Sequence, residues 1–185
     1  MRGNVLANKT AKDRPATDFY PTPPEVTISL MEFLNLPKDK VIWECACGKG
    51  HMSKAIESLG YTVISTELYQ TGYGENGVDF LTCEPRECDW IITNPPFRDS
   101  VNFIKRAISL GKPFALLLKS QYWHAKNKTE IFKMHRPRYV LPLNWRPDFH
   151  FGKKGGSPTM ECQWVVWGDE PSEITEYQIL QKPKA

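Results

Sequence analysis

The sequence predicts an α/β domain of three layers, with a mostly parallel sheet and helices on both of its faces. Short apolar runs rich in β-branched residues alternate with amphipathic segments along most of the chain. Such alternation is typical of βαβ units. The 185 residues can bury the core of one domain, and 41% hydrophobic with 24% charged residues is the balance of a globular protein.

The expected elements follow one another without a dividing linker. A first helix over 26–34 starts near Pro23 or Pro24 and ends before Pro37, because proline favours the first turn of a helix and cannot continue one. Further helices are expected at 52–60, 100–111 and 128–135, and strands at 40–46, 61–68, 77–81, 88–94, 113–120, 138–143 and 161–168. The last strand follows its predecessor through a loop, so we expect it to pair antiparallel.

Residues 18–170 are therefore expected to form a single domain between a flexible N-terminal tail over 1–17 and a peripheral C-terminal tail over 171–185. No stretch approaches the roughly 20 apolar residues of a membrane span, and the N-terminus lacks the apolar region of a signal peptide. These features predict a cytoplasmic protein that does not contact a membrane.

The five cysteines are interpreted as reduced thiols. Their number is odd and they form no repeated C-x-x-C pattern, which favours neither a disulfide framework nor a metal site. A zinc site built from Cys83, Cys88 and histidines is the alternative, but the spacing is unconvincing. No metal is expected, and none of the four histidines is assigned to catalysis.

Charge is distributed unevenly along the chain. Residues 98–154 hold thirteen Lys and Arg but only three acidic residues, whereas the whole chain has a net charge of only +3. A solvated basic face is a common explanation. Interleaved aromatic residues such as Tyr122, Trp123 and Trp145 favour instead a footprint for nucleic acid, because bases stack on such rings.

Ligands of open parallel sheets bind beyond the carboxyl ends of the strands, and four of these ends carry suitable residues. The first, "ECACGKG", places Glu44 before Gly48 and Gly50, and glycines there allow a ligand to approach the backbone. Taken alone, this motif is weak evidence. Glu67 ends the second strand and can accept both hydroxyls of a ribose, although a solvated or helix-capping acid is equally compatible. The third end offers Asp79 for an exocyclic amine and Phe80 for an adenine ring.

The fourth end is the stretch "TNPPF", residues 93–97. Two prolines force a rigid turn, which presents the Asn94 amide oxygen and the Pro95 carbonyl as two neighbouring acceptors. Together they can take both hydrogens of an amino group, while Phe97 stacks on the ring that carries it. A sharp loop without function is the alternative. No Walker A or dehydrogenase glycine motif is present, so a nucleoside fits better than a phosphate-rich nucleotide.

With these features the sequence resembles the S-adenosylmethionine-dependent N6-adenine DNA methyltransferases, and within them the small phage and prophage enzymes. Their Asp/Asn-Pro-Pro-aromatic signature matches 94–97, their acid and G-x-G motif matches 44–50, and their aromatic-Thr-Pro segment matches "YPTPPE" at 20–25. The resemblance spans about residues 18–168. It implies a Rossmann-like methyltransferase fold with seven strands, and transfer of a methyl group to adenine N6 in DNA, with the target adenine flipped out of the duplex.

By this resemblance, the catalytic residues are Asn94, Pro95, Pro96 and Phe97. The residues expected to bind S-adenosylmethionine are Tyr20, Thr22, Pro23, Glu44, Ala46, Cys47, Gly48, Gly50, Glu67, Asp79, Phe80 and Asn94. The basic region supplies the expected contacts to DNA, namely Arg98, Lys126, Lys128, Arg136, Arg138, Trp145, Arg146, Lys153 and Lys154. No separate target-recognition domain is expected, and a homodimer is one assembly that the sequence allows.

Three other functions are compatible with parts of this pattern. An RNA adenine N6-methyltransferase would use the same chemistry. A methyltransferase acting on protein glutamine uses a similar turn, but usually with tyrosine in place of Phe97 and without the 20–25 segment. A catalytically dead nucleic-acid-binding module is disfavoured because all four strand ends are intact.

Overall fold

The computed structural model describes residues 20–153 and 157–184, so the expected tail over 1–17 and Lys154 lie outside the described residues. The helices are α1 (Pro24–Leu34), α2 (His51–Ser58), α3 (Ser100–Leu110) and α4 (Lys126–Met134), with short 3-10 turns η2 (Phe97–Asp99) and η3 (Tyr122–His124). The strands are β1 (Val41–Glu44), β2 (Thr62–Glu67), β3 (Glu75–Asn76), β4 (Trp90–Thr93), β5 (Phe114–Lys119), β6 (Tyr139–Pro142), β7 (Cys162–Trp167) and β8 (Glu176–Tyr177).

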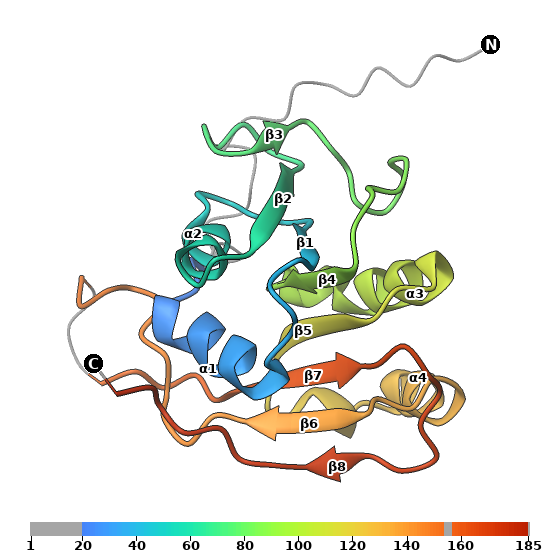
Figure 1. Ribbon diagram of the computed structural model, residues 1–185. Coiled ribbons are helices and arrows are strands. Elements are labelled where there is room, and N and C mark those ends of the chain that lie inside the picture. The colour runs from blue at the N-terminus through green and yellow to red at the C-terminus, as the bar shows by residue number, and fades with distance from the viewer. Residues whose placement is uncertain (1–19, 154–156, 185) are drawn as a thin grey trace.

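All eight strands belong to one sheet with the order β3-β2-β1-β4-β5-β7-β6-β8 (Figure 1). Strands β1 to β5 pair in parallel, and β7 is antiparallel to both β5 and β6, which confirms the antiparallel pairing expected for the last long strand. The strand order reverses between β1 and β4. Connections from these two strands leave in opposite directions there, and a crevice opens at their carboxyl ends.

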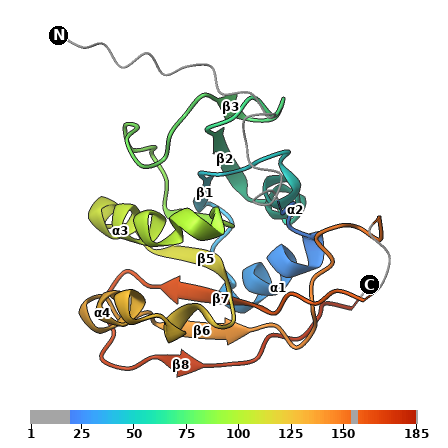
Figure 2. The same cartoon turned by 180° about the vertical axis from the view of Figure 1, so that it is seen from behind.

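The helices lie on both faces of the sheet, as expected for three layers (Figures 1 and 2). Alternate residues of the strands point to opposite faces. Ala115 and Leu117 of β5 pack with α1 and α2 in one core, whereas Leu116 and Leu118 pack with α3 and α4 in the other. Trp43 is fully buried in the second core and is held by its indole N–H, which donates to Thr66 Oγ1 at 2.9 Å.

The predicted start of α1 is confirmed, but its end is set differently. Pro24 opens the helix, and the chain leaves it at Asn35, which adopts a left-handed conformation with φ of 43°. Asparagine tolerates this conformation better than most residues. Asn35 therefore terminates α1 two residues before Pro37. No helix within 20–153 and 157–184 has the length and apolar character needed to cross a membrane.

Two expectations about the sheet are corrected. The segment 77–81 is not a strand: the chain turns at Asp79, whose carbonyl accepts from the amides of Thr82 and Cys83 at 3.1 and 2.8 Å. The outer strand is instead the two-residue β3, just before this turn. At the other end, residues 171–184 are not peripheral, because β8 pairs in parallel with β6. The sheet consequently has eight strands where seven were expected.

We expect Leu180→Ala to destabilise the protein, because this side chain is only 6% exposed and packs into the core beside α1. Truncating a buried leucine costs about 2–5 kcal/mol, and a site at the sheet edge belongs at the lower end of that range. The neighbouring Ile179 is 58% exposed, so Ile179→Ala is the matched control and should be nearly neutral. Urea unfolding of both variants is the measurement, and equal midpoints would mean that this segment contributes nothing to the core.

Candidate active site

The turn after β1 has a conformation that requires glycine. Gly48 and Gly50 have φ of 54° and 78°. A Cβ atom on Gly50 would lie 2.4 Å from the nearest ring atoms of Tyr73, so no larger residue fits without displacing that ring. The turn is tied to the sheet by the Cys47 amide, which donates to the Thr66 carbonyl at 3.0 Å. The backbone is therefore folded tightly beside the crevice and leads directly into α2.

Glu67 joins this glycine turn to the end of β2. The carboxylate accepts from the Gly48 amide through Oε2 at 2.7 Å and from the Tyr69 amide through Oε1 at 3.1 Å. The side chain is 2% exposed. Each carboxylate oxygen can accept more than one hydrogen bond. Glu67 therefore fixes the wall of the crevice and can also accept from hydroxyl groups of a ligand.

Glu44 lies at the end of β1, faces the crevice and is also 2% exposed. Ser53 of α2 donates a hydrogen bond to its Oε2, and Ser53 is linked in turn to Ser65 at 2.7 Å. Burial raises the pKa of Glu44 from its usual 4.5 to about 8; the hydrogen bond from Ser53 opposes this shift and nearby Glu67 adds to it. The acid is thus held at a place where a positively charged group would be favoured.

The turn "NPPF" brings Asn94 against the segment that precedes α1. Asn94 Nδ2 donates to the Tyr20 carbonyl at 3.2 Å and to Thr22 Oγ1 at 3.1 Å. Because both contacts use the amide nitrogen, Oδ1 remains directed elsewhere as an acceptor, and no described residue donates to it. The Pro95 carbon skeleton is buried, and Ser100 closes the turn by donating to the Phe97 carbonyl at 2.8 Å. The orientation of the Asn94 amide is therefore set by two partners.

The aromatic residues around this turn form one cluster. The Tyr20 ring lies 5.4 Å from the Phe97 ring and 5.7 Å from the Phe149 ring, measured between centroids. Phe149 belongs to the loop between β6 and β7. Lys119, the last residue of β5, places Nζ 4.9 Å from the centroid of Phe97. Segments far apart in the sequence therefore meet at the Asn94–Phe97 turn.

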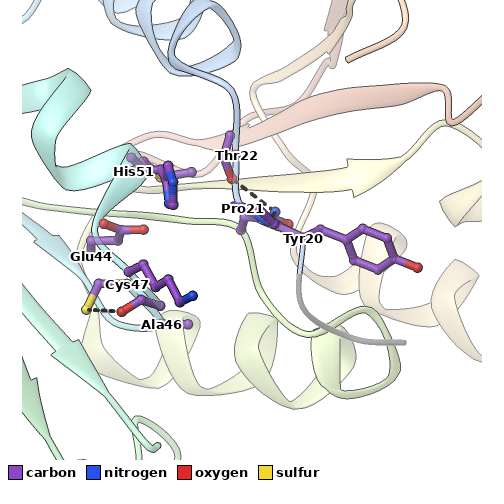
Figure 3. Close-up of a pocket in the computed structure, with 11 residues that line it drawn as sticks. Tyr20, Pro21, Thr22, Glu44, Ala46, Cys47 and His51 are labelled. Carbon is purple, nitrogen blue, oxygen red and sulfur yellow. Dashed lines mark hydrogen bonds between the residues drawn. The ribbon is translucent and has the colours of Figure 1, made fainter. Parts of the chain in front are cut away.

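His51 was not assigned a role from the sequence, but it lines the crevice opposite Thr22 (Figure 3). Its ring stacks on Phe151 with centroids 5.4 Å apart. Burial, followed by the nearby charges of Lys54 and Lys49, lowers the pKa of His51. Phe151 is presented by a turn in which Asp148 accepts from the amides of His150 and Gly152. A contact between α2 and a loop a hundred residues later leaves no local sequence signal.

The crevice contains two adjoining cavities that share Ala46. The first is lined by Tyr20, Pro21, Thr22, Glu44, Ala46, Cys47, Gly48, Lys49, His51, Met52 and Asn94. The second is mainly apolar and is lined by Cys45, Ala46, Glu67, Leu68, Tyr69, Val78, Phe80, Leu81, Pro96, Arg98, Asp99 and Phe103. Most of the residues that were predicted from the sequence to bind the cofactor thus lie together, at the point where the strand order reverses.

Four predicted cofactor residues hold different positions from the rest. Gly50 lies in the turn that opens α2, outside the lining of both cavities. Pro23 precedes α1 and lies outside the lining of both cavities, where Pro21 is found instead. Asp79 does not line either cavity; its Oδ1 accepts from the Leu81 amide at 3.0 Å and so shapes the wall. Phe80 reaches the second cavity but is itself a core residue, packed against Trp43 and Phe103. Asp99, which the sequence analysis did not single out, lines that cavity.

The predicted nucleic-acid residues do not form one continuous face. Arg98 follows the catalytic turn and Lys126 and Lys128 begin α4, while Trp145, Arg146 and Lys153 belong to the loop after β6. Strand β5 is parallel to β4, and β5 and β6 are both antiparallel to β7. Strands β4, β5 and β6 therefore point the same way and end at the edge of the sheet that carries Asn94. These six residues accordingly lie toward the edge that carries the crevice.

Arg136 and Arg138 lie at the opposite edge, because they precede β6. Arg138 also pairs with Glu176 of β8 at 2.8 Å. On the catalytic side, Arg146 pairs with Glu161 at 2.7 Å. The structure therefore separates the two arginines before β6 from the other predicted contacts.

Free thiols account for all five cysteines. Within the described part of the chain, no three His, Cys, Asp or Glu side chains gather in a group that could hold a metal ion. Cys83 and Cys88, the pair considered for zinc, belong to the segment between β3 and β4.

Comparison with known proteins shows the fold. No family model and no curated protein matches the sequence. Among solved structures, a proposed RNA methyltransferase from Pyrococcus horikoshii is 16% identical with a TM-score of 0.63, over 87% of this chain and 92% of that chain. A proposed class I S-adenosylmethionine-dependent methyltransferase from Listeria monocytogenes is 13% identical with a TM-score of 0.62, over 91% of this chain and 68% of that chain.

A type I restriction-modification methyltransferase subunit from Streptococcus thermophilus is 14% identical with a TM-score of 0.63, over 84% of this chain and 46% of that chain. At these identities the likeness is one of architecture. The chain has the α/β methyltransferase fold, in agreement with the sequence-based expectation apart from the extra strand.

The buried Glu44 predicts a pH dependence of stability. Between pH 4.5 and about 8 the unfolded chain loses the proton of Glu44 while the folded chain keeps it, since the folded pKa is about 8. The folded state then binds more protons than the unfolded state, so raising the pH favours unfolding. The free energy of unfolding falls across this window through Glu44, by at most about 1.4 kcal/mol per pH unit, and levels off above pH 8. Glu44→Gln has no such proton. Urea unfolding at several pH values should show a smaller loss of stability for the variant, and parallel curves for the two proteins would contradict this assignment.

Proposed function

We propose that the protein transfers a methyl group from S-adenosylmethionine to the N6 amino group of adenine in DNA. The observation that carries the proposal is the Asn94 amide, whose nitrogen is held by Tyr20 and Thr22 beside a crevice suited to the cofactor. A turn that served only to connect β4 with α3 would not need its polar side chain oriented by two partners.

The two cavities match the two ends of S-adenosylmethionine. The first is polar and contains Glu44, whose pKa is raised by burial, so it favours a ligand that brings positive charge next to this acid. The second is apolar and suits a flat adenine ring, with Asp99 available for the exocyclic amine. Glu67 belongs to the second cavity and is bonded to Gly48 of the first, where it can accept from the ribose hydroxyls.

The cofactor supplies an electrophilic methyl group on a positively charged sulfur. Asn94 Oδ1 and the Pro95 carbonyl accept the two hydrogens of the target amino group and so direct the N6 lone pair at that methyl group. When bound, the cofactor would pass its methyl group to N6, so that the new N–C bond would form as the C–S bond broke. The sulfur would keep the bonding electrons, and N6 would then release one proton to solvent. Positive charge develops on N6 during this step, and the two acceptors stabilise it.

The target base must leave the helical stack to reach Asn94. Phe97 offers a ring on which the flipped adenine can stack, and Lys119 beside this ring adds a cation near the phosphates. Arg98 is 62% exposed next to the turn, and Lys126 is exposed on the same side. These contacts support a polyanionic substrate, whose binding should weaken steeply with salt.

Adenine in RNA is the second candidate substrate. The chemistry at Asn94 is identical, and the solved structures with the same fold include both a proposed RNA methyltransferase and a restriction-modification subunit. The sequence resemblance to DNA-modifying enzymes favours DNA. Side-by-side assays with matched DNA and RNA oligonucleotides separate the two.

We expect Asn94→Ala to lower the turnover number about 10²–10³-fold, because one of two preorganised acceptors for the amino hydrogens is lost. Asn94→Asp keeps an oxygen of equal reach and should retain measurable activity. Phe97→Ala should raise the apparent KM for DNA through lost stacking, worth about 1–3 kcal/mol. Initial methylation rates of each variant are the measurement.

Cofactor affinity provides the control for these variants. Phe97 lines neither cavity, so calorimetric titration of Phe97→Ala with S-adenosylmethionine should give a value close to the parent. Asn94 lines the first cavity and holds Tyr20 and Thr22, so the rates of its two variants are compared at saturating cofactor. If Asn94→Ala methylates adenine at the parental rate, the turn only connects β4 with α3 and has no role in catalysis. The proposal would then lose its basis.

Asp99 and Asp79 can be compared directly as partners of the cofactor adenine. Asp99 lines the apolar cavity, whereas Asp79 is engaged with the Leu81 amide. The Asp99 side chain is 40% exposed and lies 3.5 Å from Arg98 Nε, so we expect Asp99→Asn to weaken cofactor binding by about 0.5–1.5 kcal/mol, the net contribution of one hydrogen bond. Asp79→Asn keeps an acceptor for Leu81 and should have less effect on binding. The reverse order of affinities would assign the contact to Asp79, as the sequence analysis first did.

A further inference from the structure

Helix α4 covers the face of the sheet away from α1 (Figures 1 and 2). Thr129 and Phe132 of this helix line a third cavity, of different character from the two at the crevice. Its walls come from η3, α4, strands β6 and β7 and the segment that leads into β8. Trp123, Phe132, Val140, Pro142, Gln163 and Tyr177 provide most of its surface, which is largely apolar. We call it the α4 cavity. It shares no lining residue with the cavities at Glu44 and Glu67.

Two residues that line the α4 cavity each carry a buried hydrogen-bond donor with no partner among the described residues. Gln163 is 4% exposed, and its Nε2 makes no hydrogen bond; the same holds for the indole Nε1 of Trp123. An unpaired buried polar group costs about 1–3 kcal/mol, and a leucine would fill the same space without that penalty. Gln163 is the second residue of the otherwise apolar strand β7 and lines this cavity, so a polar ligand bound there could complete its hydrogen bonding.

The α4 cavity is joined to the catalytic turn through η3. The Tyr122 hydroxyl lies 3.3 Å from Ser100 Oγ, which itself donates to the Phe97 carbonyl. The next residue along the chain, Trp123, lines the cavity. Ser120 also lines it and directly follows Lys119, whose ammonium lies over the Phe97 ring. One short segment, 119–123, therefore borders both the proposed target site and the α4 cavity.

Two cations lie along this connection. Lys128 Nζ is 3.9 Å from the centroid of the Tyr122 ring, and Lys119 Nζ is 4.9 Å from that of Phe97. Burial and the charge of Lys119 lower the pKa of Lys128, as expected for a lysine with a cationic neighbour. An anion placed near both would relieve this repulsion. The phosphates of a polynucleotide provide such an anion at regular spacing along the strand.

We propose that the α4 cavity receives a second nucleobase of the substrate strand, close to the target adenine. Gln163 hydrogen-bonds the edge of that base, the aromatic and aliphatic walls exclude water from it, and Lys119 and Lys128 neutralise the phosphates in between. A glutamine amide offers a donor and an acceptor, the pair that distinguishes bases by their edges. The site makes the protein prefer a particular base at one position near the target adenine. The inference rests on the proposed action on nucleic acid.

The first test is whether Gln163 serves the fold. Gln163→Leu removes the amide while keeping a similar shape, so the thermal midpoint should be unchanged or higher and cofactor affinity should equal the parental value. Gln178→Leu makes the same replacement at an exposed position of the C-terminal segment and is the matched control. A clear fall in thermal midpoint for Gln163→Leu alone would show that the amide supports the fold, and would overturn the assignment.

The second test uses DNA oligonucleotides with one adenine and a single abasic site placed at each neighbouring position in turn, with matched RNA in parallel. For the parent protein, one abasic position should lower kcat/KM by about tenfold, the scale of one base contact. For Gln163→Leu, kcat/KM on the intact oligonucleotide should already be about tenfold lower than for the parent. The abasic site at that position should then lower kcat/KM little further. Such non-additivity is the sign of direct contact.

The outcomes separate this inference from the proposed function. Adenine could be methylated while each abasic site lowers kcat/KM by the same factor in the parent, in Gln163→Leu and in Gln178→Leu. In that case the α4 cavity binds no base, and this inference fails while the proposed function stands. If no oligonucleotide is bound or methylated by the parent protein, the proposed function and this inference both fail.

Discussion

The reversal of strand order between β1 and β4 is the constraint on which the rest of the molecule depends. Parallel strands on either side of this point send their connections to opposite faces, so the carboxyl ends of β1 and β4 are left uncovered. Glu44 ends one of these strands and Asn94 follows the other. The polar groups of the proposed methyl-transfer site lie around this opening, and the glycine turn keeps the backbone out of it.

Contacts between distant segments then complete the opening. The stretch before α1 is held by Asn94 and contributes Tyr20, which packs against both the catalytic turn and the loop after β6. The same hydrogen bonds that orient the Asn94 amide therefore position one wall of the cavity at Glu44. This arrangement links the two halves of the proposed reaction, since a change in the stretch before α1 is felt by both the cofactor side and the target side.

Much of this organisation could be predicted from the sequence, because the signals are local. Apolar runs and glycine or proline punctuation located the long strands, and the acids and the Asn-Pro-Pro-Phe turn stood at their ends. What was missed depends on tertiary contacts. The stacking of His51 on Phe151 joins segments without shared periodicity. Strand β8 has only two residues and no apolar alternation, and the choice between Asp79 and Asp99 depends on how one turn folds. The basic residues of 98–154 are spread evenly along the sequence, so the sequence does not indicate that Arg136 and Arg138 lie at the edge of the sheet opposite the crevice.

The central claim is that this crevice methylates adenine at N6. Its most direct test is incubation of the protein with methyl-labelled S-adenosylmethionine and, separately, DNA, RNA and a glutamine-containing protein, followed by digestion and mass spectrometry of the labelled product. The account predicts label in N6-methyladenine, with DNA the better substrate and no label on glutamine. Label that never appears on adenine from either polymer would contradict it.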